Sequence, residues 1–250
     1  MAQPLQEARK EPASMLSPKV SLKRSSMITD EENTMAVAAV RTAAKGAKSS
    51  RRTATREERR QQLIAATIKC ISKKGIGSTT LGDVAQEAGL SQGIVNLHFA
   101  SKENLFNETL QFLAEDYKAQ FDGTLEKAGA EAAEKLLALM EMDLKPSVCD
   151  RQKLAVWFAF WGEVKSVPTY QKICEAYDRG YDDAINSLCQ SIIDDGKYTN
   201  ITAQTVTDAL SSITDGLWLS YLVSPKGFDR DVAMDAVYSY LRAVFPEHYE

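Results

Sequence analysis

The chain has 250 residues, of which 44% are hydrophobic and 26% are charged, so it contains enough apolar material for one large domain or two modest ones. No apolar run approaches the roughly 20 residues that a membrane-spanning helix needs, and the N-terminus lacks the apolar segment of a signal peptide. We therefore expect a cytoplasmic protein without a membrane partner. Its cysteines are widely spaced without a C-x-x-C pair, which predicts reduced, buried packing residues. They are Cys70, Cys149, Cys174 and Cys189.

The net charge of −4 is distributed unevenly along the chain. Residues 1–60 carry 13 Lys and Arg against 7 Asp and Glu, whereas residues 106–250 carry 13 against 24. Eight of the basic residues lie between Arg41 and Arg60. A basic front and an acidic rear are typical of a chain whose N-terminal part contacts a polyanion. Residues 1–50 have no sustained periodicity and almost no aromatic side chains, so we expect a disordered basic arm there.

From Thr55 onward the sequence has a helical pattern throughout. Thr55 and Glu58 have the spacing of a capping box, and Gly75 stands where a helix C-cap is expected. Apolar residues recur at helical spacing between them. The later helices are separated by glycines or end at prolines. We expect them at residues 81–88, 92–99, 102–121, 130–145, 150–166, 169–194, 203–223 and 229–245.

The sequence contains no alternating strand pattern of useful length and no internal repeat. The predicted fold class is therefore all-α, with about nine helices. We expect three parts. They are a disordered basic N-terminal arm at residues 1–50, a three-helix helix-turn-helix domain at residues 51–105, and a larger all-helical regulatory and dimerisation domain at residues 106–250.

The stretch from Leu81 to Phe99 has the pattern of a helix-turn-helix. Such a motif needs a small residue where its two helices cross, a turn residue that tolerates positive φ, and apolar residues on both sides. Ala85 supplies the small residue and Gly89 the turn, and Ser91 can cap the second helix. The apolar residues are Val84, Leu90 and Val95.

If Val95 faces inward, the opposite face of the second helix points toward where a major groove would lie. That face carries Gln92, Gly93, Asn96 and Leu97. Gln and Asn can pair bidentately with adenine, and Leu can contact a thymine methyl group. An ordinary helical hairpin would show the same few small and apolar residues. The basic arm directly upstream, which includes Arg51 and Arg52, favours DNA binding.

The run GIGSTTLGDVAQEAGLSQGIVNLHFASKENLF resembles the DNA-binding domain of TetR/AcrR-family repressors. The matching positions are Gly75, Thr79, Thr80, Val84, Ala85, Ala88, Gly89, Leu90, Ser91, Phe99, Lys102 and Leu105. The resemblance implies that Thr80 and Lys102 touch phosphates and that the second helix lies in or beside the groove. One departure is that the family usually has an aromatic residue in place of Asn96 or Leu97. His98 fits either a DNA contact or a packed, neutral histidine that closes the helix.

In the acidic half of the chain, aromatic residues gather at helical spacing. Trp157, Phe160 and Trp161 lie within one turn of each other, and Glu163 and Asp215 lie near the two apolar stripes. Aromatic faces together with a carboxylate hold quaternary ammonium ions through cation–π attraction and charge. An aromatic stripe on a buried helix is more often part of the core, so both interpretations stay open. Further candidates for a cavity wall are Tyr177, Tyr181, Trp218 and Tyr221.

Residues 154–170 and 214–224 resemble the choline-responsive BetI branch of the same family, in which the repressor controls synthesis of glycine betaine. The resemblance implies a small-molecule effector, choline or a related quaternary ammonium. It also implies a homodimer formed through the two C-terminal helices. Small residues along residues 203–223 permit a close helix approach, although the residues alone allow an intramolecular role equally well.

An enzyme would need convergent nucleophiles, bases or metal ligands. The chain has only two histidines, His98 and His248, and no zinc-protease, nucleophile-elbow, phosphate-loop or paired-cysteine motif, so we expect no catalysis, cofactor or metal. The sequence therefore indicates a ligand-responsive repressor that binds a palindromic operator on double-stranded DNA in the nucleoid. The alternatives are a TetR-type regulator with an unrelated apolar ligand and a helical interaction adaptor that does not bind DNA.

Overall fold

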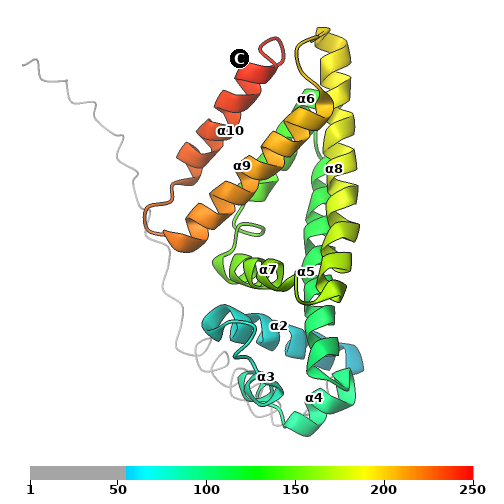
Figure 1. The fold of residues 1–250 in the computed structure, drawn as a ribbon, viewed down its shortest axis with the longest axis vertical. Coiled ribbons are helices and arrows are strands. Elements are labelled where there is room, and N and C mark those ends of the chain that lie inside the picture. The colour runs from blue at the N-terminus through cyan, green and yellow to red at the C-terminus, as the bar shows by residue number, and fades with distance from the viewer. Residues whose placement is uncertain (1–54, 250) are drawn as a thin grey trace, which may run out of the picture. The chain divides into compact units, whose positions relative to one another are not determined.

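The computed structural model describes residues 55–249, which form nine α-helices and no strand (Figure 1). This confirms the all-α prediction for the described part of the chain. The helices are α2 (Arg56–Lys74), α3 (Leu81–Ala88), α4 (Gln92–Phe99), α5 (Lys102–Leu125), α6 (Ala132–Leu144), α7 (Arg151–Glu163), α8 (Pro168–Gly196), α9 (Ala203–Val223) and α10 (Arg230–Val244). The predicted basic arm at residues 1–50 lies outside the described residues.

Local signals in the sequence fix most of the helix ends. Thr55 and Glu58 form the predicted capping box at the start of α2, and Gly75 ends that helix with a positive φ of 81°. The helix predicted to begin at residue 169 begins at Pro168 instead, because proline has no N–H to lose in the first turn of a helix. The helix predicted to end at residue 121 continues to Leu125.

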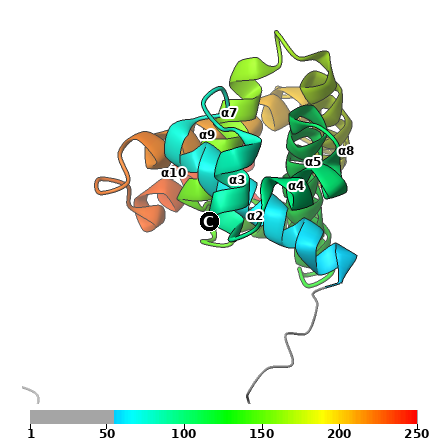
Figure 2. The same ribbon diagram turned by 90° about the horizontal axis from the view of Figure 1, so that it is seen from below.

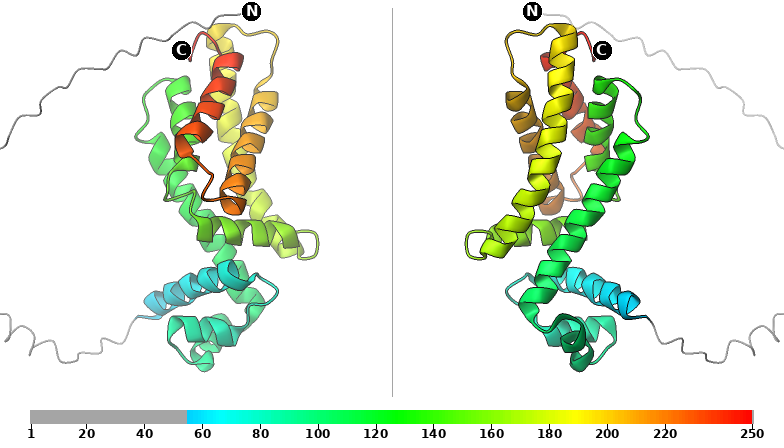
Figure 3. Two further views of the ribbon diagram at one scale, coloured as in Figure 1. Left: turned by 90° about the vertical axis from the view of Figure 1, so that its left-hand side faces the viewer. Right: turned by 90° about the vertical axis from the view of Figure 1, so that its right-hand side faces the viewer.

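The helices surround two hydrophobic cores. The first core joins α2, α3 and α4 to the beginning of α5, and it also contains side chains from α7 and from the start of α8. The second core lies among α5, α6, α8, α9 and α10 and also contains Leu154 of α7. Figure 2 looks onto the end of the molecule formed by α2, α3 and α4. In Figure 3 α7 lies between this end and the long helices, so it contacts both parts of the described chain.

Phe160 of α7 is the largest side chain that is fully buried in the first core. Its ring packs edge-on against Phe106 of α5, with ring centres 6.4 Å apart, and against Tyr170 of α8 at 4.8 Å. Val156 is buried in the same core one turn earlier in α7. These contacts fasten α7 to the helices that carry the helix-turn-helix.

All four cysteines are buried and unpaired, as the sequence predicts. Burial raises the pKa of the thiols of Cys149, Cys174 and Cys189 to about 11, so they stay protonated at neutral pH. Within residues 55–249, every helix is too short or too polar to cross a membrane.

We expect Phe160→Ala to lower the free energy of unfolding by about 3–5 kcal/mol, because it removes a fully buried ring and leaves a cavity. Urea denaturation followed by circular dichroism measures the change. Phe112→Ala is the matched control, because Phe112 of α5 is 37% exposed and its loss should cost much less. Equal losses in the two variants would show that Phe160 does not hold the first core together.

Candidate functional site

The α3–α4 unit has the geometry that the helix-turn-helix pattern predicts. Gly89 adopts the left-handed conformation, with a φ of 66°, and the N–H of Leu90 donates to the carbonyl of Ala85 at 2.9 Å. Val84 and Val95 are fully buried on the inner side of the two helices. The outer face of α4 is therefore exposed. It carries Gln92, Gly93, Asn96 and Leu97, of which Leu97 is 73% exposed.

Thr80, Ser91 and Lys102, which are also predicted to contact DNA, lie at the starts of α3, α4 and α5. Thr80 is exposed and caps α3, and its hydroxyl accepts a hydrogen bond from the N–H of Asp83 at 3.2 Å. Ser91 occupies the predicted N-cap position of α4, but its side chain makes no capping hydrogen bond. Lys102 is the first residue of α5, and its ammonium lies 5.1 Å from the centre of the Phe106 ring.

His98 is half-buried at the end of α4, beside the ring of Phe99, with ring centres 6.4 Å apart. Its Nδ1 is buried and has no hydrogen-bond partner within the described chain. The placement fits both predicted roles. The His98 ring packs against Phe99, as a structural histidine would, and it lies at the end of the helix whose outer face is exposed to a DNA groove in the proposed role. Arg51 and Arg52 lie outside the described residues.

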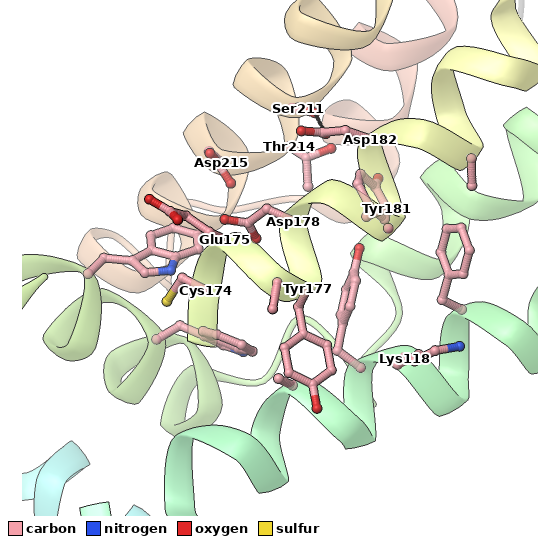
Figure 4. A pocket seen from close by; sticks show the side chains of 18 of the residues that line it. Lys118, Cys174, Glu175, Tyr177, Asp178, Tyr181, Asp182, Ser211, Thr214 and Asp215 are labelled. Atoms are coloured by element: carbon pink, nitrogen blue, oxygen red, sulfur yellow. Dashed lines mark hydrogen bonds between the residues drawn. The ribbon is translucent and has the colours of Figure 1, made fainter. Parts of the chain in front are cut away.

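A cavity of about 840 Å³ lies among α5, α7, α8 and α9 (Figure 4). Most of the residues predicted from the sequence to bind a ligand line it. They are Trp157, Trp161, Tyr177, Asp215 and Trp218. Tyr181, a further wall candidate, also lines the cavity, whereas Tyr221 packs against Phe228 and under Arg230 elsewhere.

Two predicted ligand residues, Phe160 and Glu163, do not line the cavity. Successive helical residues are rotated by about 100°, so Trp157, Trp161 and Val164 share the cavity face of α7. Phe160 is turned away from that face and is fully buried in the first core. Glu163 lies two residues beyond Trp161, on another side of the helix. The predicted role of both residues in ligand binding is therefore corrected.

The aromatic lining forms two walls. The first wall consists of Trp157 and Trp161, whose ring centres lie 6.1 Å apart on successive turns of α7. The second wall consists of Tyr117, Tyr181 and Trp218, which come from α5, α8 and α9. The Tyr117 ring lies 5.8 Å from that of Tyr181 and 6.1 Å, edge-on, from that of Trp218. The rings of both walls line the cavity and are available to a bound group.

A buried carboxylate, Asp143 of α6, stands behind the second wall. The hydroxyl of Tyr117 donates to its Oδ1 at 2.7 Å, and the hydroxyl of Tyr181 donates to its Oδ2 at 3.0 Å. Trp218 Nε1 donates to the backbone carbonyl of the same residue at 2.8 Å. Burial raises the pKa of Asp143 to about 7, although the two tyrosine hydrogen bonds act in the opposite direction. The Asp143 carboxylate thus orients the aromatic rings that line the cavity.

Sequence reasoning missed Asp143 and Tyr117. Asp143 follows Leu136, Leu139 and Met140 at helical spacings of seven, four and three residues, so it falls on the apolar face of its helix, and this was the one signal that could have singled it out. A carboxylate on such a face needs hydrogen-bond donors when the helix is buried. The donors come from helices far away in the chain, and no local pattern identifies them.

Four of the carboxylates that line the cavity have no cationic partner among the described residues. Glu175, Asp178 and Asp182 share one side of α8 at spacings of three and four residues, and Asp215 of α9 lies near Asp178 in Figure 4. The one basic residue in the lining, Lys118, pairs with Asp122.

These carboxylates repel each other. Partial burial, followed by the negative charges of Asp182, Asp215 and Glu175, raises the pKa of Asp178 to about 6, although the residue stays exposed to solvent. Burial and neighbouring carboxylates raise the pKa of Asp182 and of Asp215 as well. In the part of the chain that the structure describes, no group of three or more His, Cys, Asp or Glu side chains is arranged to hold a metal ion. The cavity is therefore suited to an organic cation with an apolar body.

Comparisons with known proteins match both regions. A family model described as bacterial regulatory proteins of the TetR family matches residues 63–109, and one described as the C-terminal domain of BetI-type transcriptional repressors matches residues 132–246. A similar curated relative is the HTH-type transcriptional regulator BetI of Paraburkholderia phymatum. It is 29% identical over 186 residues, which cover 74% of this chain and 92% of the relative.

Similar solved structures include a protein of Pseudomonas aeruginosa described as a transcriptional regulator, with a TM-score of 0.70 and 24% identity over 78% of this chain and 95% of that one. Another, described as a transcriptional regulator of Saccharomonospora viridis in complex with choline, has a TM-score of 0.67 and 22% identity over 74% of this chain and 96% of that one. The two family models lie on the helix-turn-helix and on the helices around the cavity. Residues 63–109 therefore match the TetR family of bacterial regulatory proteins, and residues 132–246 match the C-terminal domain of BetI-type transcriptional repressors.

Proposed function

We propose that this protein is a repressor that binds operator DNA as a homodimer and releases it when a small quaternary ammonium compound, choline or a close relative, enters the cavity. The observation that carries the proposal is the cavity itself, in which aromatic walls lie beside carboxylates that have no cationic partner among the described residues. The choline-bound relative from Saccharomonospora viridis supports the choice of ligand. Operator binding places the protein at the nucleoid, in the cytoplasm.

The exposed face of α4 is the part that reads the operator in this proposal. Gln92 and Asn96 offer amide groups that match adenine, and Leu97 offers an apolar contact to a thymine methyl group. In this proposal Thr80 and Lys102, at the N-termini of α3 and α5, contact backbone phosphates of the operator. The residues that complete the interface are Arg51, Arg52, Ser91, Gly93 and His98.

The dimer interface is proposed on α9 and α10. Leu219 and Val223 of α9 are 46% and 71% exposed, and Val232 of α10 is 64% exposed, so both helices present apolar side chains that a second copy could cover. Gly216 and Ser220 of α9 are also exposed and are small enough to let a second helix approach closely. A two-fold dimer would bury the same surface of both copies and place two α4 helices on one pseudo-palindrome.

An unrelated apolar ligand suits the cavity less well than a cation does. Such a ligand would remove water from Asp178, Asp215 and their neighbours without supplying any opposite charge. A quaternary ammonium supplies the charge and also covers the faces of the rings. Cation–π attraction and charge balance therefore favour the same class of ligand.

We expect Gln92→Ala to relax sequence preference, with a loss of about 1–3 kcal/mol at one base pair, because a bidentate base contact disappears. Lys102→Ala should weaken binding to every sequence alike and lower the slope of log K against log salt by about one unit. Fluorescence anisotropy with operator and random duplexes at several salt concentrations measures both effects. An unchanged ratio of operator to random affinity in Gln92→Ala would contradict the proposed orientation of α4.

Titration calorimetry should show choline binding at least tenfold more tightly than its neutral isostere 3,3-dimethylbutanol, and no binding of a fatty acid. Because a desolvated cation–π contact is worth about 2 kcal/mol, Trp161→Ala should weaken choline binding about thirtyfold. Phe112→Ala, on the surface of α5, should leave the affinity unchanged. Equal affinity for choline and the neutral isostere would rule out a cation site.

The affinity for choline should fall as the pH is lowered from 8 to 5.5, by about fivefold or more, because a cation binds best to ionised carboxylates. Two carboxyl groups titrate in this range. Asp143 has a pKa of about 7 and faces Tyr117, Tyr181 and Asp215. Asp178 has a pKa of about 6 and faces Glu175, Asp182 and Asp215. Calorimetry across this range measures the change.

The same pKa shift gives a stability test. Asp143 has a higher pKa in the folded protein than in the unfolded chain, so the folded state binds more protons and loses stability as pH rises from about 4 to about 7. Asp143→Asn removes the charge and keeps one acceptor oxygen for a tyrosine hydroxyl. We expect it to raise the melting temperature at pH 8 and to flatten the pH dependence of choline binding. A lower melting temperature at pH 8 would contradict the assignment of the charge to this residue.

A further inference from the structure

We propose that the cavity accommodates an elongated dication, a molecule with an alkylated ammonium group at each end, one on each of the two aromatic walls. This inference rests on the proposed function and names the class of ligand more closely. Its basis is the arrangement of rings, the spacing between them, the volume of the cavity and the number of carboxylates that lack a cationic partner among the described residues.

The two aromatic walls are separate surfaces. The indole of Trp161 in the first wall contacts the thiol of Cys174, which also lines the cavity. The second wall meets α8 at Tyr181, seven residues further along the same helix. At 1.5 Å per residue, the two contact points on α8 lie about 10 Å apart along the helix. Two cationic heads joined by a spacer of about this length could therefore each lie on one wall.

Each wall has its own carboxylates. Glu175 follows Cys174 directly, at the first wall, and Asp182 follows Tyr181 directly, at the second. Asp143 backs the second wall through the two tyrosine hydroxyls. Asp178 and Asp215 lie between the two ends in Figure 4. A cation on either wall would therefore have a negative group beside it, and one cation would leave the carboxylates of the other wall without a partner.

The volume of the cavity also favours a ligand with two cationic heads. A cavity of about 840 Å³ lies in the upper part of the range of about 300–1,000 Å³ that holds drug-sized ligands. Choline, with only a few heavy atoms, would leave most of this space to water. A flexible chain that joins two cationic heads would fill the space between the walls with apolar groups. Alkylated heads suit aromatic faces better than primary ammonium groups, which are more strongly hydrated.

The test is a calorimetric series with the full chain. The probes are linear alkanes with a trimethylammonium group at both ends, in which the spacer grows from much shorter to longer than about 10 Å. Each is compared with the singly charged alkyltrimethylammonium ion of the same length, and choline and spermidine are titrated alongside. We expect the ratio of the two affinities to pass through a maximum when the spacer spans about 10 Å, where the dication should bind at least tenfold more tightly than its singly charged counterpart.

Substitutions at the two ends make the test specific. Trp161→Ala and Asp182→Asn should each bring the affinity ratio close to one, because each weakens one of the two positions. Asp183→Asn is the matched control, since Asp183 is an exposed neighbour on α8 outside the cavity lining and should leave the ratio unchanged.

The outcomes separate this inference from the proposed function. If choline binds but the dications bind no better than their singly charged counterparts at any length, the inference is overturned and the proposed function stands. If spermidine binds more tightly than every alkylated dication, the assignment of alkylated heads is overturned. If neither choline nor any dication binds, the proposed function fails as well.

Discussion

The helix α7 packs on two cores at once, and the connection between the cavity and the DNA-binding end depends on this arrangement. Trp157 and Trp161 line the cavity, whereas Val156 and Phe160 are buried against the helices that carry the helix-turn-helix. Protein interiors are closely packed, so one face of a helix cannot shift without moving the other. A ligand that repositions the two tryptophans therefore acts directly on the core around α2.

The buried carboxylate of Asp143 lowers the stability of the folded protein and supplies a polar group behind the wall of the cavity. A buried carboxylate without a cation costs free energy, and here two tyrosine hydroxyls and the side chain of Thr214 compensate part of that cost. The same hydrogen bonds fix the orientation of Tyr117 and Tyr181, whose rings line the cavity. A site kept rigid in this way loses less conformational entropy when a ligand binds. The charge thus disfavours folding at neutral pH and favours a cation in the cavity.

The sequence predicted local features well and failed where distant helices meet. The capping box at Thr55, the turn at Gly89 and the inward direction of Val95 are all fixed by neighbours within a few residues. Phe160 has the same periodicity as Trp157 and Trp161, and only the packing of α7 shows that it faces the other core. Asp143 meets its partners across α5, α8 and α9, and spacing along the chain cannot reveal such contacts.

Release of DNA requires more than a ligand that fits. A compound that binds the DNA-bound and the free conformation equally well shifts nothing, so the contacts made in the cavity must differ between the two. The two walls lie on different helices, since Trp157 and Trp161 belong to α7, whereas Tyr117, Tyr181 and Trp218 belong to α5, α8 and α9. A ligand that spans both walls is therefore sensitive to the position of α7 relative to the other helices. A ligand that touches one wall senses that position only weakly, so the span across the cavity, rather than affinity alone, would decide which cations act as effectors.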